Sequence, residues 1–265
     1  FTTPYPGGLY AGTNFYDKDS TVYYPYDPEV AKALLAKAGL EDTDGNGFVN
    51  FPADTAGVGG DDVSVTLVAN SDYQTEKNLA EGVVAAMEEI GIRVLVSLVS
   101  GSNMEAVQNS GKFDWHVFRN LSELISVVQN TSALAPIGPQ TNMSHRAGSD
   151  GTLDLLPFEQ EMVDVVNAFI AESDPAARVE LMKKYQKLYT ENVFTVGLTQ
   201  YPGALIINKR FANVPAGTPI FMFNWAEDNV IRERLYVPKD KQLDVELFPA
   251  TLPGAPGIGN GPVSD

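Results

Sequence analysis

Apolar and polar residues follow two different periods along this chain, and together they predict a mixed α/β fold. Two runs rich in β-branched residues, 63–68 and 92–99, flank a stretch in which apolar residues recur every three or four positions. That stretch, 75–90, is typical of a helix with one apolar face, and Gly91 is suited to end it. A strand, a helix and a strand of these lengths predict a crossover that leaves the two strands parallel.

The clearest helix is predicted for residues 28–38. Asp27 can cap the free amides of the first turn, Pro28 has its φ preset for the first helical position, and Gly39 can end the helix. The expected apolar stripe consists of Val30, Leu34, Leu35 and Ala38.

An acidic loop follows this helix, and two interpretations of it stay open. Its oxygen-bearing residues occupy the odd positions that an EF-hand-like loop uses for calcium: Asp42, Asp44, Asn46, Phe48 through its carbonyl group, and Asn50. The twelfth position is Ala53 instead of a bidentate glutamate, which weakens any such site. The alternative is a tight turn whose aspartates bond to nearby backbone amides.

The remaining pattern predicts further helices and strands after residue 99. Helices are predicted at 103–110, 158–170, 175–191 and 228–235, and strands at 113–118, 193–198, 204–207 and 220–225. The stripes of the two long helices, from Phe158 to Ile170 and from Val179 to Tyr189, are predicted to be core. Glycines and prolines break every period beyond Phe248, which predicts an irregular tail.

Composition narrows the possible partners. The 265 residues include 34 acidic and 18 basic side chains, for a net charge of −16, so the electric field of the protein repels nucleic acid. Cysteine is absent, which excludes disulfides and thiolate metal sites. No apolar run approaches the roughly 20 residues of a membrane span. The first residues lack the pattern of a signal peptide, so we expect the N-terminal part, with any export signal, to lie outside this sequence.

Sequence motifs for catalysis are missing as well. His116 and His145 are the two histidines, on different predicted elements, and neither belongs to a zinc-protease motif. A nucleophile elbow and a phosphate-binding glycine loop are also absent. We therefore predict no catalytic residues, no metal ligands and no cofactor, and a protein that is not an enzyme.

Several motifs, in this order, carry a resemblance to a known family. They are Tyr26-Asp27-Pro28-Glu29, the run from Asp42 to Gly47, Glu89-Ile90-Gly91-Ile92, Phe113-Asp114, and the segment from Asp174 to Arg178. Together they resemble the C-terminal lobe of the solute-binding proteins of ABC importers, in the large peptide- and nickel-binding family. The resemblance covers about residues 20–215. It implies a mixed, parallel-rich sheet with flanking helices, as in one lobe of a periplasmic-binding-protein-like fold.

The resemblance also implies a domain organisation. Residues 1–20 are expected to be a crossover from a missing N-terminal lobe, and 21–214 an α/β ligand-binding lobe. Residues 215–248 would return towards the other lobe, and 249–265 form the irregular tail.

The implied function is capture of a peptide or peptide-like small solute between two lobes, followed by delivery to the permease subunits of an ABC importer. Such a protein is periplasmic or extracellular. An alternative class is a calcium-stabilised extracellular module or a glycan-active enzyme.

The candidate ligand contacts follow the predicted strand 113–118, where loops at the strand ends gather ligands in open α/β sheets. They are Arg119, Asn120 and Glu123, joined by Asn142 and Arg146 from a long loop that the family places beside its cleft. Peptide binders of the family often carry acidic residues where this chain has Arg119. This difference favours an anionic or uncharged ligand over one with a positive charge.

Overall fold

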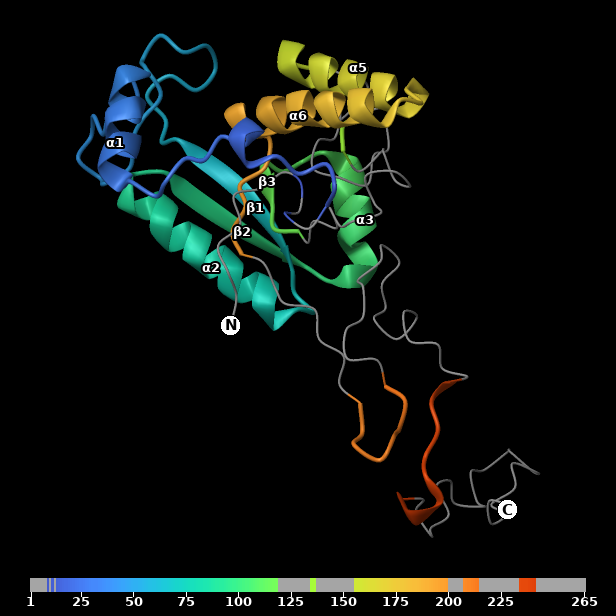
Figure 1. Cartoon of the computed structure of the whole chain (residues 1–265). Coiled ribbons are helices and arrows are strands. Elements are labelled where there is room, and N and C mark those ends of the chain that lie inside the picture. Colours follow the sequence, from blue (N-terminus) through green and yellow to red (C-terminus); the bar gives the residue numbers. More distant parts are fainter. Residues whose placement is uncertain are drawn as a thin grey trace. The chain divides into compact units, whose positions relative to one another are not determined.

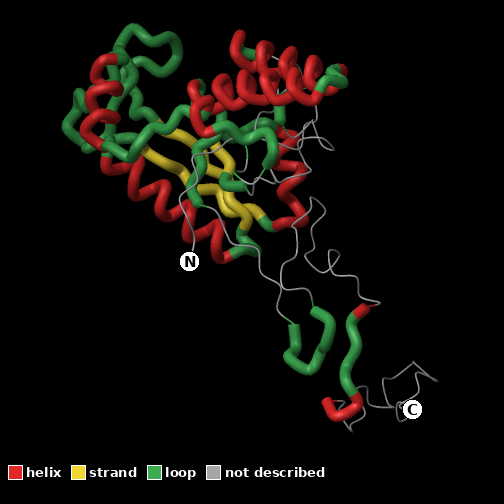
Figure 2. The backbone as a smooth tube through the Cα atoms, viewed as in Figure 1, coloured by secondary structure: helices red, strands yellow, loops and turns green. Residues whose placement is uncertain are grey.

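The computed structural model describes residues 9, 11, 13–118, 134–136, 155–199, 207–214 and 234–241, and the chain divides into two units, 1–201 and 202–265. The first unit is a mixed α/β structure built around a three-stranded sheet (Figures 1 and 2). Its elements are η1 (Lys18–Ser20), α1 (Pro28–Lys37), β1 (Ser64–Asn70), α2 (Gln74–Glu89), β2 (Arg93–Val99), α3 (Gly101–Ser110), β3 (Trp115–His116), α5 (Pro157–Ala171) and α6 (Pro175–Glu191). The predicted fold class is confirmed.

The sheet has the order β2-β1-β3, and both neighbours of β1 run parallel to it. The predicted parallel arrangement of the two long strands is therefore confirmed, with Val65 beside Val94 in the register. Helix α2 covers one face of the sheet (Figure 1). The buried residues of this core are Leu67, Ala69, Ala80, Val94 and Val117.

Strand β2 is less buried than its apolar sequence predicts. Leu95 and Leu98 each expose about half of their surface, at 52% and 53%, although the sequence predicts a buried strand here. The reason is position, because β2 has β1 on one side and no other strand beside it among the described residues. A strand in that place keeps one edge and part of its faces open.

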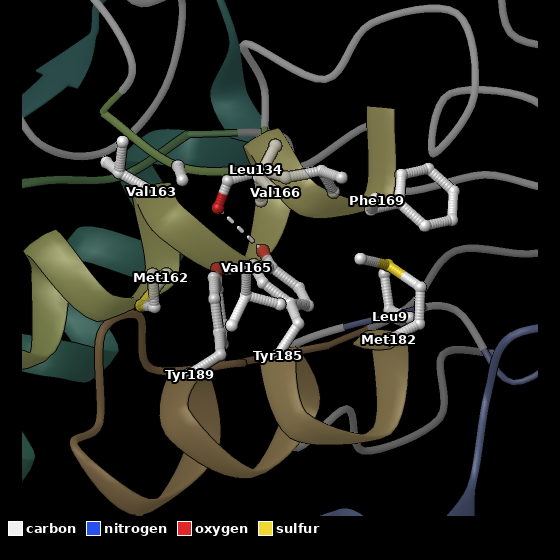
Figure 3. Packing of buried hydrophobic residues seen from close by; sticks show 11 residues of the cluster. Leu9, Leu134, Met162, Val163, Val165, Val166, Phe169, Met182, Tyr185 and Tyr189 are labelled. Atoms are coloured by element: carbon white, nitrogen blue, oxygen red, sulfur yellow. Dashed lines mark hydrogen bonds between the residues drawn. The ribbon is translucent and has the colours of Figure 1, made fainter. Parts of the chain in front are cut away.

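Helices α5 and α6 lie side by side and form a second core, in which the predicted stripes are largely confirmed (Figure 3). Met162, Val166, Phe169 and Met182 are fully buried. Ile170 is a correction, since 52% of it is exposed. This core also takes up Leu9, Leu134 and Ala135 from distant parts of the chain.

Helix α1 begins as predicted but packs differently. The carboxylate of Asp27 accepts hydrogen bonds from the backbone N–H groups of Glu29 and Val30, each at 3.1 Å. The expected apolar stripe is not buried, because Val30 and Leu34 are 54% and 59% exposed. The capping signal is local and correct, whereas burial depends on what packs against the helix.

Two predicted strands need correction. Residues 193–198 form turns and irregular backbone, and Val193 has a positive φ of 50°, which a strand does not allow. Strand β3 is only two residues long, Trp115–His116, instead of 113–118. Just before it, the side chain of Asp114, in place of a backbone carbonyl, accepts the hydrogen bond of the Thr66 N–H at 2.7 Å.

Other predictions lie outside the described residues. They are the strand at 220–225, the irregular tail at 249–265, the strand at 204–207 except its last residue, and the helix at 228–235 except its last two residues. Within the described part of the second unit, the backbone N–H of Ala212 donates to the carbonyl oxygen of Tyr236 at 2.8 Å in an antiparallel bridge. No helix among the described residues has the length and apolarity needed to span a bilayer.

Candidate functional site

The carboxyl ends of three parallel strands meet at one edge of the sheet. Asn70 ends β1, Val99 ends β2 and His116 ends β3, and the Ser71 N–H joins two of these ends by donating to the Val99 carbonyl oxygen at 2.8 Å. Ligands of open α/β sheets collect at such an edge, because the loops that leave the strands converge there. This edge is the candidate ligand-binding site.

A network of hydrogen bonds fixes the first loop of this edge, between β1 and α2. The side-chain oxygen of Asn70 accepts from the Asp72 N–H at 2.9 Å, and the Asp72 carboxylate accepts from the Gly101 N–H at 2.8 Å. The buried Glu76 accepts from the Asn70 N–H at 3.1 Å. As a result the start of α3 is held against the β1 end by a charge-assisted bond.

Gly101 allows this approach without a shift of its neighbour. A Cβ atom at this position would lie 3.0 Å from the Asp72 carboxylate oxygen, tighter than nine in ten real contacts of this kind, so the carboxylate would have to move by a few tenths of an ångström. No signal in the sequence links Asp72 to Gly101, because they are 29 residues apart and neither belongs to a recognisable motif.

Strand β3 leads the chain to the edge. Its pairing continues through Val117, whose N–H donates to the Val68 carbonyl oxygen at 2.9 Å, and Phe118 follows with 51% of its surface exposed. The ring of Phe118 lies against that of His116, with centroids 5.2 Å apart. The next residue is Arg119, the first of the predicted ligand contacts.

The predicted contacts themselves lie outside the described residues. This holds for Arg119, Asn120, Glu123, Asn142 and Arg146 alike. Their assignment therefore stays a prediction, supported by the position of β3, which delivers the chain to the carboxyl edge immediately before the first of them.

The acidic loop adopts the tight turn that was one of its two interpretations. The Asp42 carboxylate accepts hydrogen bonds from the backbone N–H groups of Gly45 at 2.7 Å, Asn46 at 3.2 Å and Gly47 at 2.9 Å. These bonds, above all that of Gly47, hold the pKa of the Asp42 carboxyl below its ordinary value.

A second carboxylate ties this loop to the sheet. Asp62 accepts from the side-chain amides of Asn46 at 2.9 Å and Asn50 at 3.1 Å, and forms an ion pair with Arg93 at 2.7 Å. The Asn46 bond and then the Arg93 bond hold the Asp62 pKa below its ordinary value. The Arg93 guanidinium also stacks on the Phe48 ring, 3.8 Å from its centroid.

The carboxylates of this loop are not clustered as metal ligands in the part of the chain that the structure describes. Among the described residues, no group of three or more histidine, aspartate or glutamate side chains is arranged to hold a metal ion. The carboxylate oxygens of Asp42 and Asp62 instead accept hydrogen bonds from the protein itself.

A parallel sheet with helices on its face presents its strand ends and their loops at one edge, where open α/β sheets bind ligands. The chain belongs to the bacterial extracellular solute-binding proteins of family 5. The sequence profile described as "Bacterial extracellular solute-binding proteins, family 5 Middle" matches residues 2–134. The resemblance inferred from the sequence is confirmed at the level of the family.

Two similar proteins cover nearly the whole chain. The periplasmic alpha-galactoside-binding protein of Rhizobium meliloti (strain 1021) is 59% identical over 264 residues, which are 100% of this chain and 38% of that protein. The periplasmic binding protein MelB of Agrobacterium fabrum C58, solved in complex with stachyose, is 57% identical with a TM-score of 0.83. That match covers 99% of this chain and 39% of MelB. The chain therefore spans about two fifths of the length of both proteins.

A more distant solved structure shares the fold. The oligopeptide-binding protein AppA of Bacillus subtilis, in complex with a nonapeptide, is 17% identical with a TM-score of 0.61, over 90% of this chain and 43% of that protein. At this identity the match supports the α/β fold and carries no information on the ligand.

Proposed function

We propose that this chain is part of a periplasmic binding protein that captures an oligosaccharide with α-linked galactosyl units and delivers it to the permease subunits of an ABC importer. The observation that carries the proposal is the 59% identity, along the whole chain, to a protein named for binding alpha-galactosides. The stachyose complex of MelB, at 57% identity, supports it independently, because stachyose contains α-linked galactose.

This proposal replaces the peptide ligand that the family resemblance implies. A neutral sugar offers hydroxyl groups and no free amino terminus, so it needs no acidic residue to hold a positive charge. The segment after β3 begins with Arg119 and Asn120, and continues to Glu123. Side chains of these types donate and accept hydrogen bonds with sugar hydroxyls.

The binding mode follows from the length of the relatives. Because the chain spans about two fifths of them, we propose that the carboxyl edge of the sheet forms one wall of the cleft and that a preceding lobe forms the other. Closure of two lobes around a ligand is the usual mode of periplasmic binding proteins. The protein is then a binding protein and not an enzyme, and its transport partners are the importer subunits.

Calorimetric titration tests the proposal, with the longer protein that contains this chain and its preceding lobe. We expect raffinose and stachyose to bind, and lactose, whose galactose is β-linked, to bind at least about tenfold more weakly, which corresponds to about 1.4 kcal/mol. Binding of an oligopeptide without binding of any α-galactoside would overturn the assignment. The 265-residue chain alone is expected to bind weakly, because it supplies only one wall.

A further inference from the structure

The acidic loop contains two chemically labile peptide links, Asp44–Gly45 and Asn46–Gly47. In both, the backbone nitrogen of the glycine can attack the side-chain carbonyl carbon of the residue before it and close a five-membered succinimide ring. Glycine is the least hindered residue at the attacking position, because it has no Cβ atom. The same two dipeptides recur in the sequence at Asp150–Gly151 and Asn260–Gly261.

One carboxylate holds both attacking nitrogens. Asp42 Oδ1 accepts the Gly45 N–H at 2.7 Å, and Asp42 Oδ2 accepts the Gly47 N–H at 2.9 Å. Attack requires the loss of that proton, and the amide anion that results carries negative charge. A carboxylate at hydrogen-bond distance stabilises the N–H and opposes the anion, so its charge works against the reaction at both links.

The side chain under attack is fixed as well. Asn46 Oδ1 accepts from the Phe48 N–H at 2.8 Å, while Asn46 Nδ2 donates to Asp62 Oδ1 at 2.9 Å and to Asp44 Oδ2 at 3.2 Å. Rotation of the carboxamide towards the Gly47 nitrogen would break these bonds. The loop therefore restrains both partners of the reaction at this link.

We propose that Asn46 and Asp44 are modification sites, open to deamidation and isomerisation, which Asp42 keeps unreactive while the loop is folded. At Asn46 the Gly47 nitrogen forms a bond to Cγ, the Cγ–Nδ2 bond breaks, and Nδ2 leaves as ammonia with the proton lost from the Gly47 nitrogen. Water then opens the ring to aspartate or isoaspartate. At Asp44 the ring closes with loss of water from the side-chain carboxyl group, and water reopens it.

The products of these reactions weaken the loop. An aspartate in place of Asn46 loses the two N–H donors that reach Asp44 and Asp62, and sets a third negative charge beside them. Isoaspartate adds one carbon atom to the backbone of the turn. Either product removes hydrogen bonds that keep the loop folded, so a modified loop opens more easily than an intact one.

Peptide mass spectrometry of the full 265-residue chain tests the proposal during incubation at mildly alkaline pH. The synthetic peptide of residues 41–50 gives the rates of a free chain, and Asn260–Gly261 serves as a reference link in the same sample. We expect both loop links to react about tenfold or more slowly than in the peptide. In Asp42→Asn the rates at both loop links should rise towards those of the peptide, while the rate at Asn260 stays unchanged.

A second variant and a second measurement separate shielding from loss of the fold. Asp54→Asn removes a nearby exposed charge and should leave all rates unchanged. Amide hydrogen exchange of residues 41–62 reports whether the loop of Asp42→Asn stays closed. Faster modification in a closed loop shows a direct effect of the carboxylate, and faster modification with parallel loss of protection shows that Asp42 acts by keeping the loop folded; both support the proposal. Loop rates in the intact chain equal to those of the peptide, or slower reaction in Asp42→Asn, would overturn it.

Discussion

Gln186 on α6 donates a hydrogen bond from its side-chain amide to the backbone carbonyl oxygen of Phe15 at 2.8 Å, although 171 residues separate the two. The same carboxamide accepts a hydrogen bond from the Asp17 N–H at 3.0 Å, so it binds the backbone on both sides of Tyr16. Gln186 is 1% exposed. One buried side chain of α6 therefore binds residues 15–17 to the helical core.

Replacing Gln186 with leucine should destabilise the chain by roughly 1–3 kcal/mol, because it leaves the Phe15 carbonyl and the Asp17 N–H without their partner. A urea titration followed by circular dichroism measures the change. Lys187→Leu, at the next and exposed position of the same helix, is the control and should alter stability by less than about 0.5 kcal/mol. Equal effects of the two variants would contradict this role.

The core between α5 and α6 offers a matched pair of neighbours. Phe169 is fully buried and packs edge-on against Phe15, with ring centroids 5.3 Å apart, whereas Ile170 is 52% exposed. Phe169→Ala should lower the free energy of unfolding by about 3–5 kcal/mol, since it leaves a cavity. Ile170→Ala should cost about 1 kcal/mol or less, because much of that side chain already contacts water. Similar losses for the two variants would show that the stripe is buried differently.

Stability in acid should depend on Asp42 and Asp62. Their pKa values in the folded state lie below the ordinary 3.8, held down chiefly by the Gly47 N–H and by the Asn46 amide. A lowered pKa contributes stability above pH 3.8, and that contribution is lost as the pH falls through the folded-state pKa. Thermal melts from pH 5 to pH 2 should therefore fall less steeply for Asp62→Asn than for the unaltered chain. An unchanged slope would contradict the coupling.

At high pH, Tyr189 should act in the opposite sense. Burial raises the pKa of its phenol to about 12 from an ordinary value of 10.0, and its hydroxyl lies 2.6 Å from that of Thr195. The unfolded chain then loses this proton at lower pH than the folded chain, so stability falls between about pH 10 and 12, by roughly 2–3 kcal/mol. Tyr189→Phe should reduce this fall in alkaline urea titrations.

Among the proposed ligand contacts, substitution of Arg119 gives the clearest test of the site. In the longer protein, Arg119→Ala should weaken α-galactoside binding by about 1.5–3 kcal/mol, or at least about tenfold in Kd, through loss of a charged hydrogen-bond donor. Lys112→Ala removes a cation before β3, at the amino end of the strand, and should leave Kd unchanged. Unaltered binding in Arg119→Ala would remove this residue from the site.

Local signals in the sequence predicted the elements well, and burial less well. Asp27 caps α1 as expected, and Asp174 caps α6 in the same way, because a cap needs only the residues of the next turn. The burial of Leu95 was predicted wrongly, and Leu34 is exposed although it belongs to an apolar stripe. Apolar spacing shows which residues share a face and not what covers that face. The turn at Val193 was missed for a similar reason, because its apolar sequence suits a strand.

The sequence predicts the position of the candidate site, whereas its predicted contacts lie outside the described residues. The order of strands and the segment after β3 indicate the carboxyl edge of a parallel sheet. The contact of Asp72 with Gly101 requires knowledge of which loops meet, and the sequence carries no period that links them. The family was recognisable because short motifs recur in a fixed order, whereas the proposed ligand class rests on the similar proteins.

The excursion 52–59, which follows the acidic loop, is a place where this chain can change in length. The Phe51 N–H donates to the Asp61 carbonyl oxygen at 2.9 Å, and the Gly60 N–H donates to the Phe51 carbonyl oxygen at 3.0 Å, so the base of the excursion 52–59 is closed. Val49, just before that base, exchanges backbone bonds with Gly91 and Val63 at the amino edge of the sheet. Insertions or fluorescent labels placed within 53–58 should therefore leave the sheet intact. A deletion that reaches Val49 would remove the backbone hydrogen bonds that Val49 makes with Gly91 and Val63.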